Sequence, residues 1–225
     1  MIVVTGATKG LGAAIVKRLT SKGHDMFGIA RNTANLSVEG MSCDVSSYEQ
    51  VKTVAQHLKK KGVTVDAVVN AAGIGSMNLA VTTPPAVTQN IIQTNLFGTI
   101  YCSQLFAPLM LRRKQGVIIN FSTIAVALGL KGESIYTASK AGVEGFSRAF
   151  AREMADFNVR VNCIAPGPIN TNLLKGVSDT QIQKIVSQQI IPKQFVPSDV
   201  CDLVELLVDK RARSLSGQVL NVGGS

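Results

Sequence analysis

The stretch "VVTGATKGLG" (3–12) joins a short β-branched apolar run to a glycine turn and the beginning of an amphipathic segment. That segment, "LGAAIVKRLTSKG" (11–23), has apolar residues at 11, 15, 16 and 19, the spacing of one helix face, and it ends at Gly23. A strand, a glycine turn and a helix in this order form a seat for pyrophosphate, because the free N–H groups of a helix amino terminus attract anions. The stretch therefore predicts a dinucleotide-binding α/β protein.

The rest of the chain repeats the order of strand and helix. Short apolar runs occur at 26–30, 67–73, 116–122, 159–167 and 217–224, with helical patterns between them. Runs that are apolar on both faces are typical of parallel strands covered by helices on either side. The pattern predicts a doubly wound, Rossmann-type parallel sheet of about seven strands with helices on both faces. No internal repeat or Pro, Gly or Ser-rich linker interrupts it, so one domain of residues 1–225 is expected.

Composition restricts the class of protein. No apolar run approaches the roughly 18 residues of a membrane span, and the first glycine turn comes too early for a signal peptide, so a cytoplasmic protein without membrane contact is expected. The four cysteines lack paired spacing, which predicts buried free thiols rather than a disulfide framework or metal site. The net charge of +9 fits either basic helix ends or a patch for an acidic partner. Aromatic residues make up 5% of the chain and Trp is absent, so nucleic acid is not an expected partner.

Several motifs follow one another along the chain. After "TGATKGLG" (5–12) come "VNAAG" (69–73), "YTASK" (136–140), "APGPINT" (165–171) and "SGQVLNVGG" (216–224). This series resembles the short-chain dehydrogenase/reductase family, and within it the single-domain, NADP-dependent 3-oxoacyl-acyl-carrier-protein reductases. The resemblance covers nearly the whole chain. It implies a nicotinamide cofactor and a Tyr–Lys proton-transfer site.

The choice of cofactor rests on two cations. In dinucleotide sites an acidic residue after the second strand binds the ribose 2′-hydroxyl, whereas an Arg there accommodates a 2′-phosphate. The second run ends "GIARN" (28–32), so Arg31 stands at this position, and Lys9 lies inside the glycine turn, where family members that use NADP often carry a second cation. Two cations facing one phosphate predict NADP(H) rather than NAD(H).

The resemblance also supplies the other cofactor positions. Asp44 in "CDVS" matches the residue that holds the adenine amino group, Val69 replaces the first Asn of the family's NNAG motif, and Ile169 and Thr171 match the groups near the nicotinamide amide. The expected cofactor-binding set is Gly6, Thr8, Lys9, Gly10, Leu11, Gly12, Arg31, Asp44, Val45, Asn70, Ala71, Gly73, Tyr136, Lys140, Pro166, Gly167, Ile169 and Thr171.

Tyr136 and Lys140 lie four residues apart, which places them on one face of a helix. Reducing a carbonyl takes a hydride from the cofactor and a proton from the protein. Moving a phenol from a pKa of about 10 to about 7 takes roughly 4 kcal/mol, and a nearby cation can provide much of it. Tyr136 is therefore the expected proton donor, with Lys140 lowering its pKa. The resemblance further implies that Lys140 holds the nicotinamide ribose.

Two more catalytic positions come from the resemblance. A hydroxyl about thirteen residues before the tyrosine falls on Thr123 in "NFSTIAV" (120–126), with Ser122 as the alternative. Ser122, Thr123 and Tyr136 are the expected substrate contacts. Asn95 in "QTNLFGT" matches the family's proton-relay Asn, or it serves the local backbone instead. No metal site is expected.

These residues predict NADPH-dependent reduction of a ketone to a secondary alcohol, with a 3-oxoacyl thioester as a candidate substrate. Two alternatives stay open, oxidation of a secondary alcohol on a sugar or steroid, and a non-enzymatic NADP(H)-binding redox sensor. The segment 172–195, with apolar residues at 182, 185 and 186, either closes over a ligand or packs on the sheet. The basic run "LRRK" (111–114) is a candidate contact for acyl carrier protein. A homo-tetramer or dimer is the expected assembly.

Overall fold

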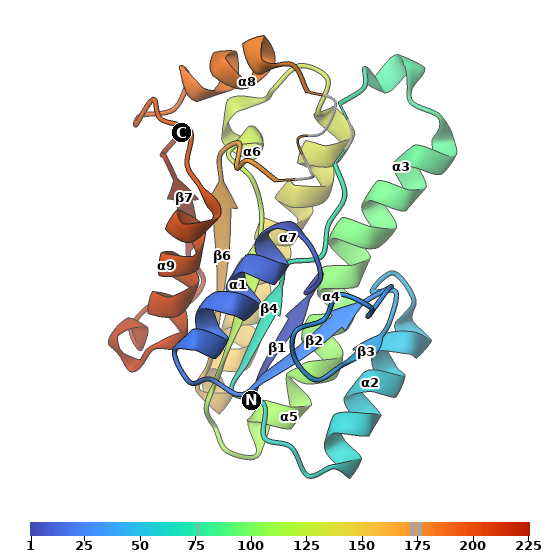
Figure 1. Ribbon diagram of the computed structural model, residues 1–225, viewed down its shortest axis with the longest axis vertical. Helices are drawn as coiled ribbons and strands as arrows, with labels where there is room; N and C mark the ends of the chain where they lie inside the picture. Colours follow the sequence, from blue (N-terminus) through green and yellow to red (C-terminus); the bar gives the residue numbers. More distant parts are fainter. Residues whose placement is uncertain (76, 172–173, 175–176) are drawn as a thin grey trace.

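A parallel sheet runs through the middle of the protein (Figure 1). The computed structural model describes residues 1–75, 77–171, 174 and 177–225. Seven strands pair in the order β3-β2-β1-β4-β5-β6-β7, and every neighbouring pair is parallel. They are β1 (Ile2–Thr5), β2 (Met26–Ala30), β3 (Gly40–Ser42), β4 (Ala67–Asn70), β5 (Gly116–Phe121), β6 (Val159–Pro166) and β7 (Val219–Val222). This order confirms the predicted doubly wound sheet.

Helices cover both faces of the sheet (Figure 1). On one face, α1 (Gly10–Ser21) and α9 (Pro197–Val208) pack against each other and the sheet. On the other face lie α2 (Tyr48–Lys60), α4 (Gly98–Phe106) and α7 (Ser134–Met154). Shorter elements are α3 (Pro85–Ile92), α5 (Pro108–Leu111), α6 (Ala125–Leu128), α8 (Asp179–Val186), a π-helical turn (Gln93–Phe97) and 3₁₀ turns at Ala80–Thr82, Ala155–Phe157 and Lys210–Ala212.

The alternation of side chains along each strand produces two hydrophobic cores. In β1, Ile2 and Val4 join the core under α1 and α9, whereas Val3 joins the core under α2, α4 and α7. Successive residues of a strand point to opposite faces, so a strand covered on both sides is apolar at most of its positions. All four cysteines are buried and free, as the spacing predicted. Among the described residues, no helix is both long and apolar enough to cross a bilayer.

The predicted strands are longer than the observed ones at their carboxyl ends. The run 67–73 contains β4, which ends at Asn70, and the run 217–224 contains β7, which ends at Val222. Residues beyond these points leave the sheet as loops. Because all strands are parallel, these loops gather at one edge, the usual place for a ligand site in such a sheet. Figure 1 shows α6 and α8 above this edge.

Candidate active site

The glycine turn between β1 and α1 has room for an anion. Gly6 and Gly10 have φ angles of +67° and +53°, which a side chain would strain. A Cβ on Gly12 would collide with the carbonyl oxygen of Gly6, so the helix approaches the turn closely. Lys9, the N-cap residue of α1, makes no side-chain cap bond, and the first turn of the helix contains no acid. The first N–H groups of α1 are therefore available to a phosphate, as a dinucleotide requires.

Two cavities form a continuous path along the carboxyl edge of the sheet. One, of about 510 Å³, begins at Gly10, and the other, of about 270 Å³, ends at Tyr136. Both are lined by Thr171, Leu174 and Val177. The path joins the pyrophosphate seat to the proposed proton donor, which is the arrangement that a nicotinamide dinucleotide needs.

The two cations chosen from the sequence are exposed. Arg31 follows β2, and its carbonyl oxygen accepts a hydrogen bond of 2.9 Å from the Ser42 hydroxyl. Among the described residues neither Lys9 nor Arg31 forms an ion pair. Both side chains are thus free to meet an incoming phosphate.

Two expected cofactor residues direct their side chains into the protein instead. The Val45 side chain packs against Gly98 of α4, where an added Cβ would lie 2.8 Å from it. The Asn70 amide nitrogen donates to Ser103 Oγ (3.1 Å) and to Asn120 Oδ1 (2.8 Å), so this side chain joins β4 to α4 and β5. Only the backbone of these residues remains for a cofactor. The Asp44 side chain differs from these two because, within the described part of the chain, only one of its oxygens is engaged. Its Oδ1 accepts hydrogen bonds from the N–H and hydroxyl of Ser46, whereas its Oδ2 accepts none from the described residues.

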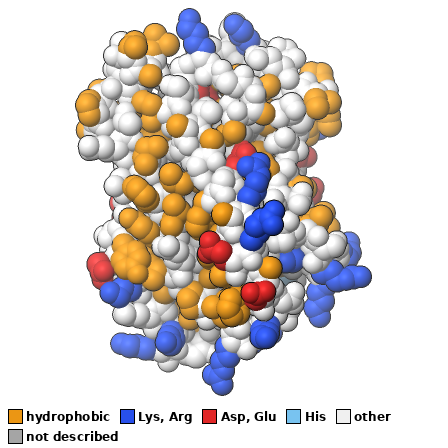
Figure 2. Space-filling view, turned by 180° about the vertical axis from the view of Figure 1, so that it is seen from behind, with side chains coloured by type: hydrophobic (Ala, Val, Ile, Leu, Met, Phe, Trp, Pro, Cys, Tyr) orange, Lys and Arg blue, Asp and Glu red, His pale blue; other side chains and the backbone are white. Residues whose placement is uncertain are grey.

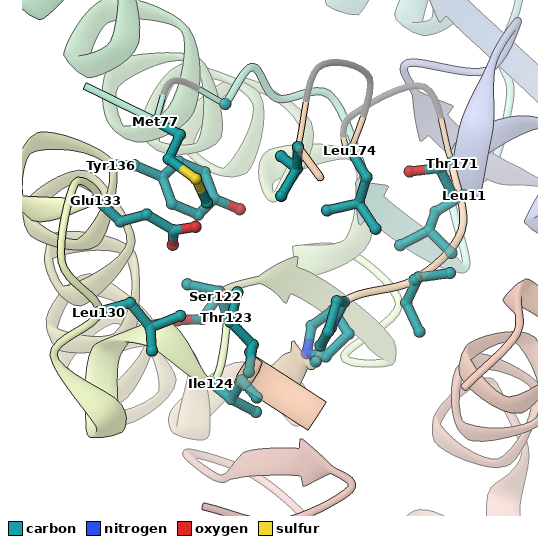
Figure 3. A pocket seen from close by; sticks show the side chains of 17 residues that line it. Leu11, Met77, Ser122, Thr123, Ile124, Leu130, Glu133, Tyr136, Thr171 and Leu174 are labelled. Carbon is teal, nitrogen blue, oxygen red and sulfur yellow. The ribbon is translucent and has the colours of Figure 1, made fainter. Parts of the chain in front are cut away.

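Three of the predicted site residues, Ser122, Thr123 and Tyr136, line the 270 Å³ cavity (Figure 3). Tyr136 lies in the first turn of α7, and its phenol hydrogen-bonds with the Thr123 hydroxyl, just beyond the end of β5. Lys140 is 5% exposed, and its Nζ donates to the Phe121 carbonyl (2.9 Å) and lies 5.9 Å from the Tyr136 ring centre. The sequence spacing of four residues thus gives the shared helix face that was predicted.

The pKa values differ from the sequence expectation. Burial raises the pKa of Tyr136 above its usual value, the nearby Glu133 carboxylate raises it further, and the bond with Thr123 lowers it in part. Burial also lowers the pKa of Lys140 to about 8. The net shift of the phenol pKa is therefore upward, whereas a downward shift was expected. The cause is that losing water disfavours the phenolate more than its hydrogen bond favours it.

The structure separates the two candidate hydroxyl groups. Ser122 Oγ is buried and donates to Glu144 Oε1 (2.7 Å), a carboxylate that is also paired with Arg148. Thr123 Oγ1 accepts from the Ala125 N–H (3.2 Å) and bonds with Tyr136. A substrate oxygen next to Tyr136 would thus meet the Thr123 hydroxyl, whereas the Ser122 hydroxyl is already engaged.

Asn95 is fully buried within the π-helical turn. Its Oδ1 accepts from the Ile74 N–H (2.8 Å), and its Nδ2 donates to the Ile74 carbonyl (2.9 Å) and to Ser139 Oγ (3.1 Å). The side chain therefore ties the loop after β4 to α7. A Cβ on Gly73 of that loop would lie 3.4 Å from Asn95 Oδ1 and 3.5 Å from Lys140 Nζ. Both groups of the Asn95 amide are thus engaged by Ile74 and Ser139, and the proton-relay role stays a prediction.

Further residues at the site were not predicted. Glu133, Met77 and Leu130 line the cavity with Tyr136 (Figure 3). Glu133 stands three residues before Tyr136, so helix spacing alone would have placed it beside the phenol. Met77 and Leu130 belong to loops that carry no periodic signal.

The segment after Thr171 contains α8, whose residues Ile182, Ile185 and Val186 are all buried. Ile185 lines the smaller cavity and Ile182 the larger one. The helix therefore packs over the predicted ligand path with the three residues that the sequence selected. Residues 172–173 and 175–176 of the predicted variable segment lie outside the described residues.

The basic run 111–114 lies at the other end of the sheet. It begins at the last residue of α5 and ends before the first residue of β5, whereas the candidate hydroxyl groups of Ser122 and Thr123 follow the last residue of that strand. Six residues of strand span roughly 20 Å. Arg113 also pairs with Asp66, their side-chain atoms being 3.0 Å apart. Within one chain, the run does not border the cavity.

A glycine turn on a parallel sheet, joined by a cavity to a Tyr, a Lys and a hydroxyl, defines a dinucleotide-dependent oxidoreductase. The family model described as short chain dehydrogenase matches residues 1–182, and the chain belongs to this family. A 3-oxoacyl-[acyl-carrier-protein] reductase, FabG of Staphylococcus epidermidis, is 30% identical, with 99% of this chain and 96% of the relative covered.

Two solved structures are similar along nearly their whole length. One is 4-hydroxyisoleucine dehydrogenase complexed with NADH, with a TM-score of 0.91, 25% identity, and 99% of this chain and 97% of the other covered. The other is ElxO with NADP bound, with a TM-score of 0.88, 26% identity, and coverage of 98% and 96%. Proteins of this fold with either nicotinamide cofactor thus resemble the chain.

Proposed function

We propose that this chain is an NADPH-dependent reductase, one catalytic domain of residues 1–225, that converts a ketone into a secondary alcohol. The observation that carries the proposal is the cavity path from the glycine turn to the bonded pair Thr123 and Tyr136, with Lys140 beneath it. When bound, the nicotinamide supplies the hydride for the carbonyl carbon.

The protein's own residues handle the proton. The raised pKa of Tyr136 keeps its phenol protonated at neutral pH, so the phenol can donate to the developing alkoxide. The Thr123 hydroxyl holds the carbonyl oxygen beside it. Lys140, whose pKa is about 8, is mostly charged at neutral pH and stabilises the phenolate left after the transfer. In the same proposal Asn95 supports the site by fixing the loop that carries Gly73.

Lys9 and Arg31 support NADPH as the cofactor. Both are exposed cations, Lys9 at the amino end of α1 and Arg31 directly after β2, and neither is paired with an acid among the described residues. Asp44, Gly73 and the segment from Pro166 to Thr171 complete the expected cofactor set. The similar NADH-bound and NADP-bound proteins do not favour one cofactor, so this assignment rests on charge.

The candidate substrate is a 3-oxoacyl thioester, as the name of the FabG relative suggests. A carrier protein held at Arg112 and Arg113 would be distant from the cavity of the same chain. We therefore propose that a carrier docked there serves another subunit of a dimer or tetramer. Three half-buried aromatic residues support such an assembly: Phe97 in the π-helical turn, Tyr101 in α4 and Phe146 in α7. Hydrophobic side chains gather on this side of the protein (Figure 2), as a subunit interface would need.

A second candidate is oxidation of a secondary alcohol, which the dehydrogenase among the similar structures favours. That direction needs Tyr136 as a base, and the raised pKa of the phenol works against it. The redox-sensor alternative needs no proton donor, so the bonded Thr123 and Tyr136 favour an enzyme.

The test is NADPH oxidation, followed by absorbance, over 3-oxoacyl thioesters, sugar ketones and cyclic ketones. We expect turnover that Tyr136→Phe reduces by about 100-fold or more, because a positioned proton donor contributes 10²–10⁴-fold. NADPH binding, measured by fluorescence, should change little in this variant. Turnover that is unaffected by Tyr136→Phe would refute the mechanism, and alcohol oxidation as the only activity would establish the second candidate.

A further inference from the structure

Glu133 places a carboxyl group in the cavity that Tyr136 lines. It precedes the first residue of α7, and its side chain points into the cavity beside the Tyr136 ring and above Leu130 (Figure 3). Its backbone N–H donates to Leu130 and its carbonyl accepts from Thr137, so the main chain is satisfied. Among the described residues, however, no ion pair or hydrogen bond engages the carboxylate.

The surroundings of this carboxylate do not favour its charge. Leu130, Met77 and Ile124 are apolar neighbours in the cavity lining, and burial raises the pKa of Glu133 above its ordinary value. Within the described ranges 1–75, 77–171, 174 and 177–225, no basic group offsets this effect. A half-buried acid without a partner destabilises a fold, so its presence at the reacting end of a cavity points to a partner outside the protein.

Structural roles for Glu133 find no support. Although it occupies the N-cap position of α7, its side chain makes no cap hydrogen bond. Among the residues that the structure describes, no group of three or more His, Cys, Asp or Glu could hold a metal ion with it. Its one resolved electrostatic effect is on Tyr136, the group that meets the substrate oxygen.

We propose that Glu133 determines substrate specificity by accepting a hydrogen bond from a donor group, hydroxyl or ammonium, that the substrate carries next to the reacting carbonyl. The proposal rests on the ketone reduction proposed above, which places the carbonyl oxygen between Tyr136 and Thr123. A donor on the adjacent carbon is then within the part of the cavity that Glu133 shares with Tyr136. For the same reason Glu133 disfavours ketones that carry a carboxylate at that carbon.

Small ketones that differ in one group provide the test. Hydroxyacetone, aminoacetone and butanone have the same number of heavy atoms and differ only in the donor, and pyruvate carries a carboxylate. We expect the wild type to reduce the better of the two donor-bearing ketones with a kcat/KM about 10- to 100-fold above that for butanone, the range for a hydrogen bond to a charged group. The ketone with the larger increase in kcat/KM over butanone shows whether the preferred donor group is a hydroxyl or an ammonium.

Two variants of Glu133 isolate its contribution. Glu133→Leu should abolish the preference, chiefly through KM, and Glu133→Gln should keep a preference of only a few-fold while improving kcat/KM for pyruvate. The control is Glu153→Gln, an exposed acid on the same helix, which should leave every ratio unchanged. Urea unfolding and NADPH fluorescence titration establish that the variants fold and bind cofactor.

The outcomes separate this inference from the proposed function. If the wild type reduces ketones but Glu133→Leu keeps the same preference ratio, the role of Glu133 is refuted while the reductase stands. If the wild type reduces only 3-oxoacyl thioesters, which carry no hydroxyl or ammonium next to the ketone, the role of Glu133 is likewise refuted while the reductase stands. If no ketone or thioester is reduced, the proposed function fails first, and the specificity role fails with it.

Discussion

Replacing Lys140 by methionine should stabilise the protein at neutral pH while it removes the reductase activity. Lys140 is 5% exposed, and burial lowers its pKa from 10.5 to about 8. At 1.36 kcal/mol per pKa unit, keeping this amine charged in the fold costs roughly 3 kcal/mol. Methionine removes that cost but loses the bond to the Phe121 carbonyl, worth about 1 kcal/mol. The expected net gain is about 2 kcal/mol, or roughly 5 °C in Tm.

The dependence on pH has a definite sign. The pKa of Lys140 is lower in the folded protein than in the unfolded chain, so between pH 8 and 10.5 the unfolded chain binds more protons. The wild type therefore becomes more stable relative to the variant as pH rises through this window, by up to about 1.36 kcal/mol per pH unit. Above the window the amine is neutral in both states, and the variant should be the less stable protein by about 1 kcal/mol.

Urea unfolding of the two proteins at several pH values between about 7 and 10.5 measures the difference in their free energies of unfolding. The titration of the other lysines and the tyrosines contributes equally to both proteins and cancels in this difference. NADPH oxidation measured in parallel should fall about 100-fold or more in Lys140→Met, in keeping with the loss of a positioned catalytic group. A variant that is destabilised equally at both ends of the pH range would refute the reasoning. In that case the charge of Lys140 would have to be compensated within the fold.

Three further predictions concern single side chains. Thr123→Ala should lower kcat by about 100-fold and Ser122→Ala by less than about tenfold, because the Ser122 hydroxyl is bonded to a carboxylate rather than to Tyr136. If steady-state kinetics show the larger loss of kcat in Ser122→Ala, the roles of the two residues are exchanged. Arg31→Asp should weaken NADPH binding relative to NADH binding, both measured by fluorescence titration. An unchanged ratio of the two affinities would exclude Arg31 from the site of the 2′-phosphate. Gly12→Ala should destabilise the fold by about 1–3 kcal/mol, because its Cβ meets the backbone of the turn. Gly145→Ala, with open space around its Cβ, should be neutral or stabilising, and equal urea midpoints for the two would contradict the close approach at Gly12.

Features that depend on neighbours along the chain were predictable. The β-branched runs gave the strands, and the spacing of Leu11, Ile15 and Leu19 gave α1, because side-chain periods of two and 3.6 residues are properties of the local backbone. The glycine turn was predictable for the same reason, since positive φ angles at Gly6 and Gly10 are local requirements. The shared helix face of Tyr136 and Lys140 followed from their spacing alone.

Other features depended on residues distant in sequence. The sequence could not assign the buried amides, because Asn95 bonds to Ile74 and the Asn70 amide nitrogen bonds to Ser103 and Asn120. Asn70 Oδ1 is buried without a partner among the described residues. The sequence also could not show that the basic run 111–114 is distant from the cavity, because this distance depends on the direction of β5 within the sheet.

The sequence by itself determined the doubly wound sheet and the glycine turn, and it predicted Tyr136 as the proton donor. Only the tertiary structure decided that Thr123 rather than Ser122 faces Tyr136, that the phenol pKa is raised, and that Glu133 enters the cavity. The physical reason is that periodicity and turn geometry arise within one segment. Burial, and the partner that each polar group finds, arise only when separate segments exclude water together.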